Sequence, residues 1–532
     1  MKKIFKPLVA VLSLGLTLLA VSCTDGFEDA NINGNAPGMT DISSNGLFNN
    51  ANKALINASR GDFSSGRIAL PWVQYSAQRN YTEEDRFQYR VGTGNSFYLD
   101  HYLIAQDYRT ILDLNTNPAT VGQTSAYGNT QNQIAAARIM LAYTFCELTD
   151  TFGDIPYYSY GNSDPDFQAL ALDGKILKPK FATQEKIYTD LMKELKEASA
   201  MIVLGQPVFI KGDLLFGNNA AKMQIFANSL RLRIANRVKS VIPAAAVHIT
   251  EAIAAGVMTS NADNVGLKFE NTDVYPSPMY VSHFVRNRDD FGVSNTFVDL
   301  LKGTRGNFPV DPRLQKYAAP ISADLLDIRD KTYVETADLS QYIGMPYGIT
   351  TSDAESQRPN TSFFSYNILK KDYTEILMEY SEVEFLLSEN AGWNDVNYKA
   401  GVRASMEKWG VDNAAITAYI AALPAASQAN VMNQKYIALF MQPYEAWAEY
   451  RRTGFPDTLL KPNQTYTTNN LFPTPNGTFI YTFEALNGLI DLPTRLQYPT
   501  NSAQLNGVNY AAAVTSMGGP DNLTTKLIWD NN

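Results

Sequence analysis

The chain has few of the residues on which most catalytic and metal sites depend: two cysteines and three histidines among 532 residues. Cys23 and Cys146 alone cannot form a disulfide framework or a cysteine-based zinc site. The histidines His101, His248 and His283 form no His-Glu-x-x-His pair, and the chain has neither a Gly-x-Ser-x-Gly turn nor a Gly-Lys-Ser/Thr phosphate loop. These absences remove the signatures of zinc proteases, serine hydrolases and nucleotide-binding enzymes, and we expect no cofactor.

Positive charge is also scarce, since 44 Lys and Arg stand against 53 Asp and Glu and the net charge is −9. Nucleic-acid binding needs a basic face, and the sequence has no basic run, so nucleic acid is excluded as a partner. Asn162, Asp164 and Asp166 alternate as a calcium loop begins, but the required glycine and final glutamate are missing, so no metal site is predicted. A glycoside hydrolase needs only two carboxylates, which leaves that alternative open.

The first 22 residues are predicted to be a lipoprotein signal peptide. Lys2, Lys3 and Lys6 precede an uncharged apolar stretch over residues 7–21, an order typical of secretory signals. The stretch is shorter than the roughly 20 apolar residues that span a bilayer. Residues 19–23, Leu-Ala-Val-Ser-Cys, resemble a bacterial lipobox, in which the cysteine is lipidated. Several acyl chains on Cys23 would hold the protein on a membrane.

Residues 23–50 are predicted to form a flexible acidic tether. Asp25, Glu28 and Asp29 follow the lipidated cysteine and resemble the acidic export signal that sends many Bacteroidota lipoproteins to the outer cell surface. Residues 31–50 are rich in Asn, Gly and Ser, which is typical of a flexible linker. We find no later linker that would divide the chain, so residues 51–532 are predicted to form a single domain.

Helical periodicity dominates much of the mature chain, because apolar residues recur at steps of three and four. The segments with this pattern are 133–151, 185–204, 219–238, 376–387 and 425–452. Residues 261–365 and 453–532 show little of it and are rich in aromatics and prolines. Loops of this length are usually functional or disordered, and the aromatic content favours ordered excursions over a helical scaffold. The pattern predicts a mostly α fold, and degenerate tetratricopeptide-like hairpins are compatible with it.

Five segments resemble, in order, motifs of the SusD/RagB-like nutrient-binding outer-membrane lipoproteins. They are residues 140–157, which end in Thr-Asp-Thr-Phe-Gly-Asp-Ile-Pro-Tyr, and residues 226–237, 380–389, 434–456 and 492–499. With the lipobox, the ordered set spans nearly the whole chain. All five segments are interpreted as structural. Gly153 with Pro156, and Gly454 with Pro456, are expected to end helices, and Trp447 is expected in the core. The arginines of the second segment are expected to pair with acids: Arg231, Arg233 and Arg237 with, for example, Glu384 and Glu449.

The resemblance implies a SusD-like fold, with four tetratricopeptide-like helix pairs and a large loop-rich half that faces outward. It also implies a lipid-anchored protein on the outer membrane, facing the cell exterior as a lid over a SusC-like TonB-dependent transporter, without catalytic activity. Such a protein would bind a nutrient and deliver it to the transporter. We expect an oligosaccharide. The alternatives are a peptide or another non-sugar nutrient bound by the same architecture and, third, a glycoside hydrolase.

Two aromatic and polar loop regions are the candidate ligand sites, because sugar rings stack on aromatic faces while planar polar side chains bond the hydroxyls. The first region contributes Trp72, Tyr75, Arg79 and Tyr81. The second contributes Tyr275, Tyr280, Phe284, Arg286, Arg288 and Phe291. Alanine at Trp72 or Tyr280 is expected to weaken ligand binding without unfolding the protein.

Overall fold

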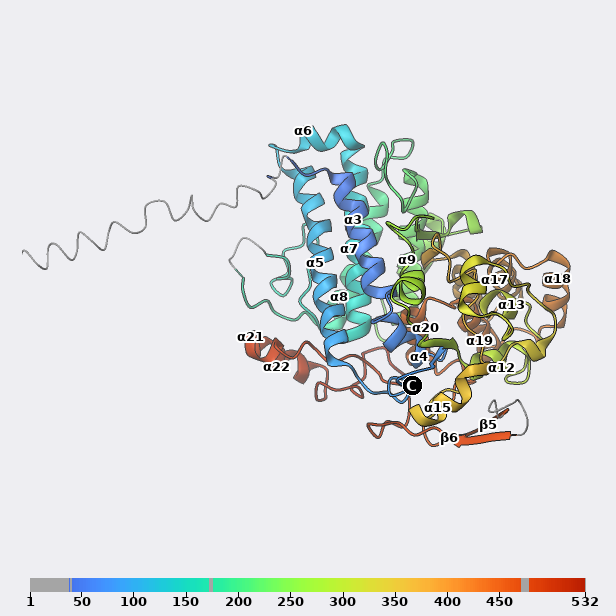
Figure 1. The fold of residues 1–532 in the computed structure, drawn as a ribbon. Helices are drawn as coiled ribbons and strands as arrows, with labels where there is room; N and C mark the ends of the chain where they lie inside the picture. The colour runs from blue at the N-terminus through green and yellow to red at the C-terminus, as the bar shows by residue number, and fades with distance from the viewer. Residues whose placement is uncertain (1–37, 39–40, 172–175, 470–477, 532) are drawn as a thin grey trace, which may run out of the picture.

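The computed structural model describes residue 38 and residues 41–171, 176–469 and 478–531. Over these residues the chain is mostly α-helical, as predicted, with three two-stranded sheets and long irregular segments (Figure 1). Among the same residues, no helix is both long and apolar enough to cross a membrane.

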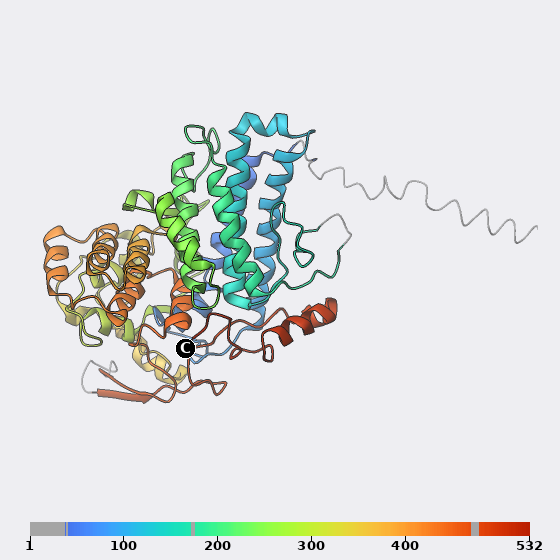
Figure 2. The same ribbon diagram turned by 180° about the vertical axis from the view of Figure 1, so that it is seen from behind.

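A row of long helices forms the N-terminal part of the fold (Figures 1 and 2). Each helix packs against the next one in chain order. The row consists of α3 (Ser44–Arg60), α5 (Val91–Thr116), α7 (Thr130–Phe152), α8 (Gln184–Ala200), α9 (Ala220–Val238) and α10 (Ala245–Ala255). Phe48 of α3 and Tyr108 of α5 meet edge to face, with ring centroids 6.2 Å apart. Both rings are fully buried, and burying a side chain of this size contributes about 1.5–3 kcal/mol.

A second group of helices has one member, α12, within the loop-rich segment 261–365 and five members after it. It consists of α12 (Asn295–Leu301), α16 (Tyr380–Asn390), α17 (Asp395–Lys408), α18 (Asn413–Ala422), α19 (Gln428–Ala438) and α20 (Pro443–Thr453). Helix α16 packs against α17 and α19, and it also contacts α9, which joins the two groups. Phe440, between α19 and α20, is the centre of an aromatic cluster, with its ring centroid 4.3 Å from Tyr317 and 5.0 Å from Phe297.

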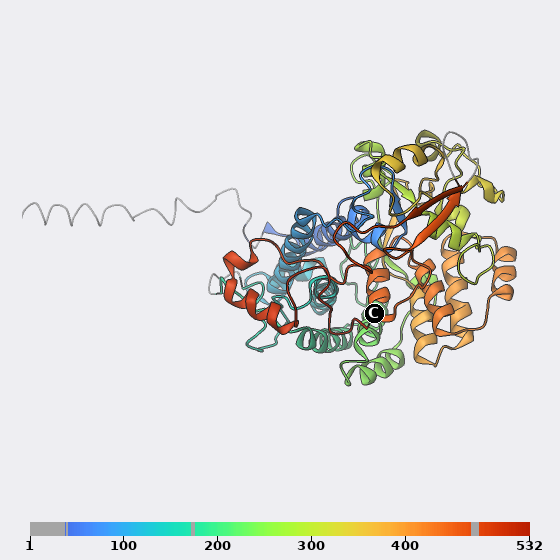
Figure 3. The same ribbon diagram turned by 90° about the horizontal axis from the view of Figure 1, so that it is seen from below.

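Shorter elements connect and cover the two groups. The short helices are η2 (Ser65–Ala69), α4 (Leu70–Trp72), α6 (Val121–Thr124), η3 (Ser125–Tyr127), η4 (Asn261–Asp263), α11 (Pro278–Tyr280), η5 (Val281–Val285), α13 (Leu314–Tyr317), α14 (Leu325–Asp330), η6 (Leu339–Gln341), α15 (Thr351–Gln357), η7 (Arg358–Asn360), α21 (Ser502–Leu505) and α22 (Gly507–Ser516). Seen from below, the C-terminal segments in red extend from α21 and α22 to the β5–β6 hairpin (Figure 3).

The strands pair in antiparallel couples. They are β1 (Ser76–Gln78) with β3 (Phe291–Val293), β2 (Val265–Lys268) with β4 (Thr374–Met378), and β5 (Thr465–Asn469) with β6 (Thr478–Thr482). In the first couple, Ala77 lies opposite Gly292. This pairing brings the two predicted ligand regions, more than two hundred residues apart in the sequence, to the same part of the molecule.

The predicted helix ends are confirmed. Helix α7 begins after Asn129, whose side chain accepts a hydrogen bond from the Asn132 N–H, and ends before Gly153 at φ 92°. Helix α20 ends before Gly454, which has a left-handed φ of 74°. Glycine adopts these positive angles without the steric cost that a Cβ brings. Trp447 is fully buried, as expected.

Charged side chains inside the fold form an extended network between α7, α9, α16, α19 and α20. Arg237 pairs with Asp150 and Glu445, and its Nη2 lies 3.9 Å from Glu449. Further pairs join Lys435 to Glu449 at 2.9 Å and Arg452 to Glu449 at 2.7 Å. The network thus ties the first helical group to the second through ion pairs that are shielded from water.

Two expectations need correction. Helix α3 begins at Ser44 and Phe48 is buried, so the folded domain starts before Ala51, where the sequence placed the end of the tether. Residues 31–50 are mostly polar, so no helical pattern is visible there in the sequence, although Leu47 and Phe48 stand at the start of the helix. Of the two acids named as possible partners of the arginines, Glu449 lies near Arg237, whereas Glu384 accepts a hydrogen bond from Asn397. Arg233 pairs with Glu382, two positions earlier on the same helix.

Candidate ligand-binding groove

Three adjoining hollows on the protein surface, of about 280, 360 and 750 Å³, form one groove along the exposed side of α3. The first two share Lys53, Phe269 and Tyr275 in their walls, and the last two share Asn57, Asp62 and Arg286. We call this continuous depression the α3 groove. Its walls come from α3, from the loop and π-helix that follow it, from the start of α5, and from residues 268–286. The largest of the three hollows alone, at about 750 Å³, is within the range of cavities that accept small molecules.

A close approach of the backbone shapes one wall of the groove. Helix α3 ends at Arg60, and the chain turns at Gly61. A Cβ on Gly61 would stand 2.6 Å from the Asn57 carbonyl oxygen, which is too close for any side chain. The turn places Asp62 and Phe63 at the groove, directly ahead of the π-helix that carries Arg67.

An ion pair crosses the groove between two of its walls. The Arg286 guanidinium donates to both carboxylate oxygens of Asp62 at 2.8 and 2.9 Å. The Arg286 side chain is 51% exposed, whereas the Asp62 side chain is 12% exposed, so the charge pair is open to the groove from one side. Both contacts are made by the same nitrogen, Nη1, and they join the 281–286 segment to the end of α3.

Two aromatic rings in the walls are exposed. Phe63 is 44% exposed and Tyr275 is 48% exposed, and each is large and apolar enough to stack against a sugar ring. Asn57, Thr93 and Ser96 lie in the same walls and supply donors and acceptors for hydroxyl groups. The groove thus combines the two components that carbohydrate recognition needs.

Two family models match the chain. The model described as "Starch-binding associating with outer membrane" covers residues 36–476, and the model described as "Susd and RagB outer membrane lipoprotein" covers residues 426–530. The first spans well over half of the chain. The chain belongs to the SusD-like family. No curated protein matches it.

Solved structures share the SusD-like fold over nearly the whole chain. A chitin-binding protein is 24% identical with a TM-score of 0.71, covering 92% of this chain and 100% of its own. A SusD homolog from Parabacteroides distasonis is 20% identical with a TM-score of 0.72, covering 92% and 98%. A chitin-binding SusD homolog from Flavobacterium johnsoniae is 22% identical with a TM-score of 0.65, covering 92% and 99%. At these identities the likeness is one of fold.

Of the predicted ligand contacts in this SusD-like protein, Tyr275 and Arg286 line the groove. Four others are buried and present no surface to a ligand: Trp72, Tyr75, Arg79 and Phe291. The Trp72 ring packs edge to face on Trp447 with centroids 5.2 Å apart. Tyr75 stacks on Tyr436 with centroids 4.6 Å apart. The expectation that these four residues face a ligand is therefore corrected: Trp72 and Tyr75 pack on α20 and α19, and Arg79 and Phe291 are buried at the β1–β3 pair.

The buried Arg79 has a structural role. Its guanidinium donates to the Thr361 backbone carbonyl and hydroxyl and lies 3.9 Å from the centroid of the Phe363 ring. Burial lowers the pKa of Arg79 to about 10, with Asp289 opposing the shift. Arg79 therefore fastens the segment after β1 to residues 361–363.

The remaining four predicted contacts lie outside the groove walls. Tyr81 is 57% exposed and has a left-handed φ of 57°. Tyr280 packs on Phe284 with ring centroids 5.0 Å apart, and Arg288 pairs with Asp290 at 3.1 Å. None of these four side chains lines any of the three hollows that form the groove.

Sequence reasoning missed several groove residues: Lys53, Asp62, Phe63, Arg67 and Asp100. Phe63 and Arg67 stand in a run of Gly and Ser between two helices, which is a local signal of an exposed turn. That signal does not indicate which later segment faces the turn. The groove exists only because residues 268–286 fold back against α3.

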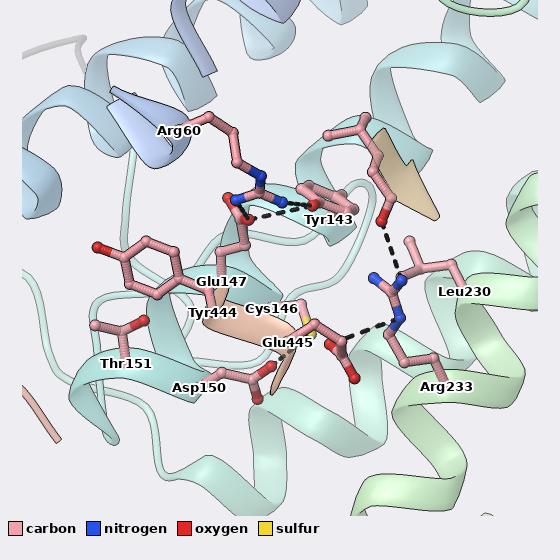
Figure 4. A pocket seen from close by; sticks show the side chains of 11 residues that line it. Arg60, Tyr143, Cys146, Glu147, Asp150, Thr151, Leu230, Arg233, Tyr444 and Glu445 are labelled. Atoms are coloured by element: carbon pink, nitrogen blue, oxygen red, sulfur yellow. Dashed lines mark hydrogen bonds and ion pairs between the residues drawn. The ribbon is translucent and has the colours of Figure 1, made fainter. Parts of the chain in front are cut away.

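A separate, enclosed cavity lies beside the buried charge network and is not a ligand site. Its space for solvent is about 20 Å³, enough for one water molecule. Figure 4 shows Arg60, Glu147, Arg233 and Glu445 pointing toward one another around it, with Cys146 between them. Burial raises the pKa of the Cys146 thiol, and the neighbouring Asp150 carboxylate adds to the effect. The thiol is therefore held in its neutral form, as expected for a structural cysteine.

The alternating acids of the calcium-like segment are engaged with lysines. Lys186 donates to Asp164 at 3.1 Å and to Asp166 at 2.6 Å, and Lys180 donates to Asp166 at 2.7 Å. These lysines draw down the pKa of Asp166 through direct hydrogen bonds. Within the described ranges of the chain, no group of three or more His, Cys, Asp and Glu is arranged to hold a metal ion.

Proposed function

We propose that this SusD-like protein is a surface lipoprotein of the outer membrane that binds an oligosaccharide in the α3 groove and delivers it to a SusC-like TonB-dependent transporter. In this proposal residues 1–22 are the signal peptide and acyl chains on Cys23 anchor the protein. The following tether is shorter than the sequence predicts, since α3 begins at Ser44. Tyr81, Tyr280, Phe284 and Arg288 are not part of the proposed site.

The observation that carries the proposal is the exposure of Phe63 and Tyr275 within a groove that also offers Asn57, Asp62 and Arg286. Exposing a large apolar ring to water is unfavourable in free energy, so exposed rings often belong to binding sites. A hollow that combines aromatic and polar side chains is typical of a ligand-binding site. Membership of a family described as starch-binding supports a sugar ligand, and two of the solved relatives are described as chitin-binding.

A glycan array with the detergent-solubilised lipoprotein tests the binding claim. We expect at least one oligosaccharide to bind the wild type and to bind Tyr275→Ala at least about fivefold more weakly, which corresponds to a loss of about 1 kcal/mol or more. Lys399→Gln is the matched control, since it alters an exposed side chain of α17 outside the groove. Binding of peptides with no binding of any glycan would contradict the proposal. Steady release of new reducing ends, lost on changing one carboxylate, would show a glycoside hydrolase instead.

The anchor and the partner are tested in cells. Wild type is expected to incorporate labelled palmitate and to copurify with a β-barrel transporter from outer membranes, whereas Cys23→Ala is expected to lose the label. A wild-type protein that takes up no label and is recovered free of membrane would refute the lipoprotein assignment.

A further inference from the structure

The α3 groove is basic, although the chain as a whole carries a net charge of −9. Five cations stand in its walls against three carboxylates. The cations are Lys53, Arg67, Arg90, Lys268 and Arg286, and the carboxylates are Asp62, Asp100 and Glu270. A concave surface in which one sign of charge is in excess attracts ligands of the opposite sign, and here cations exceed carboxylates by two. The local excess therefore favours an anion over a neutral or cationic ligand.

Some of these charges are already neutralised by partners. Arg286 is paired with Asp62, Arg90 donates to the buried Glu84 at 2.9 Å, and Lys268 lies 3.7 Å from Asp372. Lys53 and Arg67, in contrast, have no ion-pair partner within 4 Å among the described residues, although Glu270 acts on Lys53 from a greater distance and opposes the lowering of its pKa by burial. These two cations are consequently available to a charged ligand.

Each of the two available cations lies against one of the two exposed rings. The Lys53 ammonium stands 3.1 Å from the centroid of the Tyr275 ring, and the Arg67 guanidinium stands 4.5 Å from the centroid of Phe63. Both distances are within the range of cation–π attraction. A neutral sugar that stacks on the covered face of either ring must first displace the cation. A sugar with an acidic substituent can pair with the cation where it stands.

We propose that the α3 groove accepts an anionic oligosaccharide, one whose rings carry carboxylate or sulfate groups, with Lys53 and Arg67 binding the acidic substituents. This inference rests on the proposed function, and it narrows the ligand from oligosaccharides in general to anionic oligosaccharides. Phe63 and Tyr275 contact the sugar beside the two cations, and Asn57 is placed to bond hydroxyls. The Asp62–Arg286 pair lies between the two cationic positions as a structural crosslink of the groove, since Asp62, Arg286 and Asn57 are shared by its two larger hollows.

Matched ligand pairs test this inference on the full lipoprotein in detergent. Oligogalacturonate is compared with its neutral methyl ester, and a sulfated carrageenan hexasaccharide with its desulfated, uncharged form, by calorimetry. We expect at least one acidic form to bind at least tenfold more tightly than its match. Its affinity should fall several-fold between 0.05 and 0.5 M NaCl, because salt screens exposed charges over a shorter distance.

Variants that remove one positive charge test whether Lys53 and Arg67 bind the acidic substituents. Arg67→Gln and Lys53→Gln are each expected to weaken binding of the acidic form by about three- to fivefold, as for an exposed ion pair, and the double variant by about tenfold or more. Lys399→Gln removes an equal charge outside the groove and is expected to leave affinity unchanged. A melting temperature within about 1 °C of wild type shows that the double variant remains folded.

The outcomes separate the two proposals. If neutral and acidic forms bind equally, or if only neutral glycans bind, the anionic inference is overturned while oligosaccharide binding stands. If an acidic form binds but the double variant binds it as well as wild type does, the assignment to Lys53 and Arg67 is overturned. If acidic peptides bind and no glycan does, both proposals fail.

Discussion

Replacing Arg237 with methionine tests the claim that the buried charge network joins the two helical groups. Arg237 on α9 is 1% exposed and pairs with Asp150 of α7 and Glu445 of α20. Methionine keeps an unbranched side chain but removes the charge and every hydrogen bond. The two carboxylates are then left buried with one cationic partner fewer, and that is the main cost of the substitution.

The expected loss of stability can be derived from the burial of the Arg237 ion pairs. Removing one partner of a buried ion pair costs about 3–5 kcal/mol. The unfolding entropy is about 2.1 cal/mol/K per residue, so a chain of this size unfolds with roughly 1.1 kcal/mol/K. The melting temperature should therefore fall by about 3–5 °C at neutral pH.

The assay is thermal unfolding followed by circular dichroism at pH 7.5 and pH 4.5. Burial raises the pKa of Asp150 and Arg237 opposes that shift, so the variant's carboxyl is protonated more readily still. Protonation removes the unpaired charge, and the loss in melting temperature should be smaller at the lower pH. Lys399→Met, which breaks an exposed pair on one helix, should change it by less than about 1 °C. A loss below about 1 °C in Arg237→Met at pH 7.5 would refute the reasoning.

Three further predictions follow from the same structure. Trp72→Ala should destabilise the protein by about 3–5 kcal/mol, seen in denaturant unfolding, while the folded fraction keeps its ligand affinity, because the ring belongs to the core. Tyr275→Ala should weaken oligosaccharide binding by about 1–3 kcal/mol in calorimetry, as for comparable stacking platforms, without a change in melting temperature. Burial raises the pKa of Glu375 from 4.5 to about 8, so the folded chain holds a proton that the unfolded chain releases and stability falls as pH rises through this window. Glu375→Gln removes that loss, and its melting temperature relative to wild type should therefore increase between pH 5 and pH 8. A constant difference would contradict the raised pKa.

The helical scaffold could be predicted because its signals are local. The periodic segment 219–238 coincides with α9 (Ala220–Val238) to within one residue, and Gly153 and Gly454 end their helices where the turn chemistry requires. Ion-pair partners were harder to predict, since Glu382 and Glu384 lie on one helix and only its rotation selects the one that meets Arg233.

The groove could be predicted only in part. Tyr275 and Arg286 belong to a loop whose aromatic and charged composition marks it as a candidate, and both line the groove. Trp72 and Tyr75 carry the same composition signal but fill the core, because aromatic residues serve both purposes equally well. Phe63 could not be predicted as a groove residue from the residues next to it in the sequence. It lines the groove only because residues 268–286 form the opposite wall.

The most direct test of the central claim is a crystal structure of the protein with the oligosaccharide that binds it most tightly. If the protein binds oligosaccharide as proposed, electron density for the sugar is expected in the α3 groove, in contact with Phe63 or Tyr275 and with Lys53, Arg67 or Arg286. Ordered sugar at another surface, with the α3 groove empty, would contradict it.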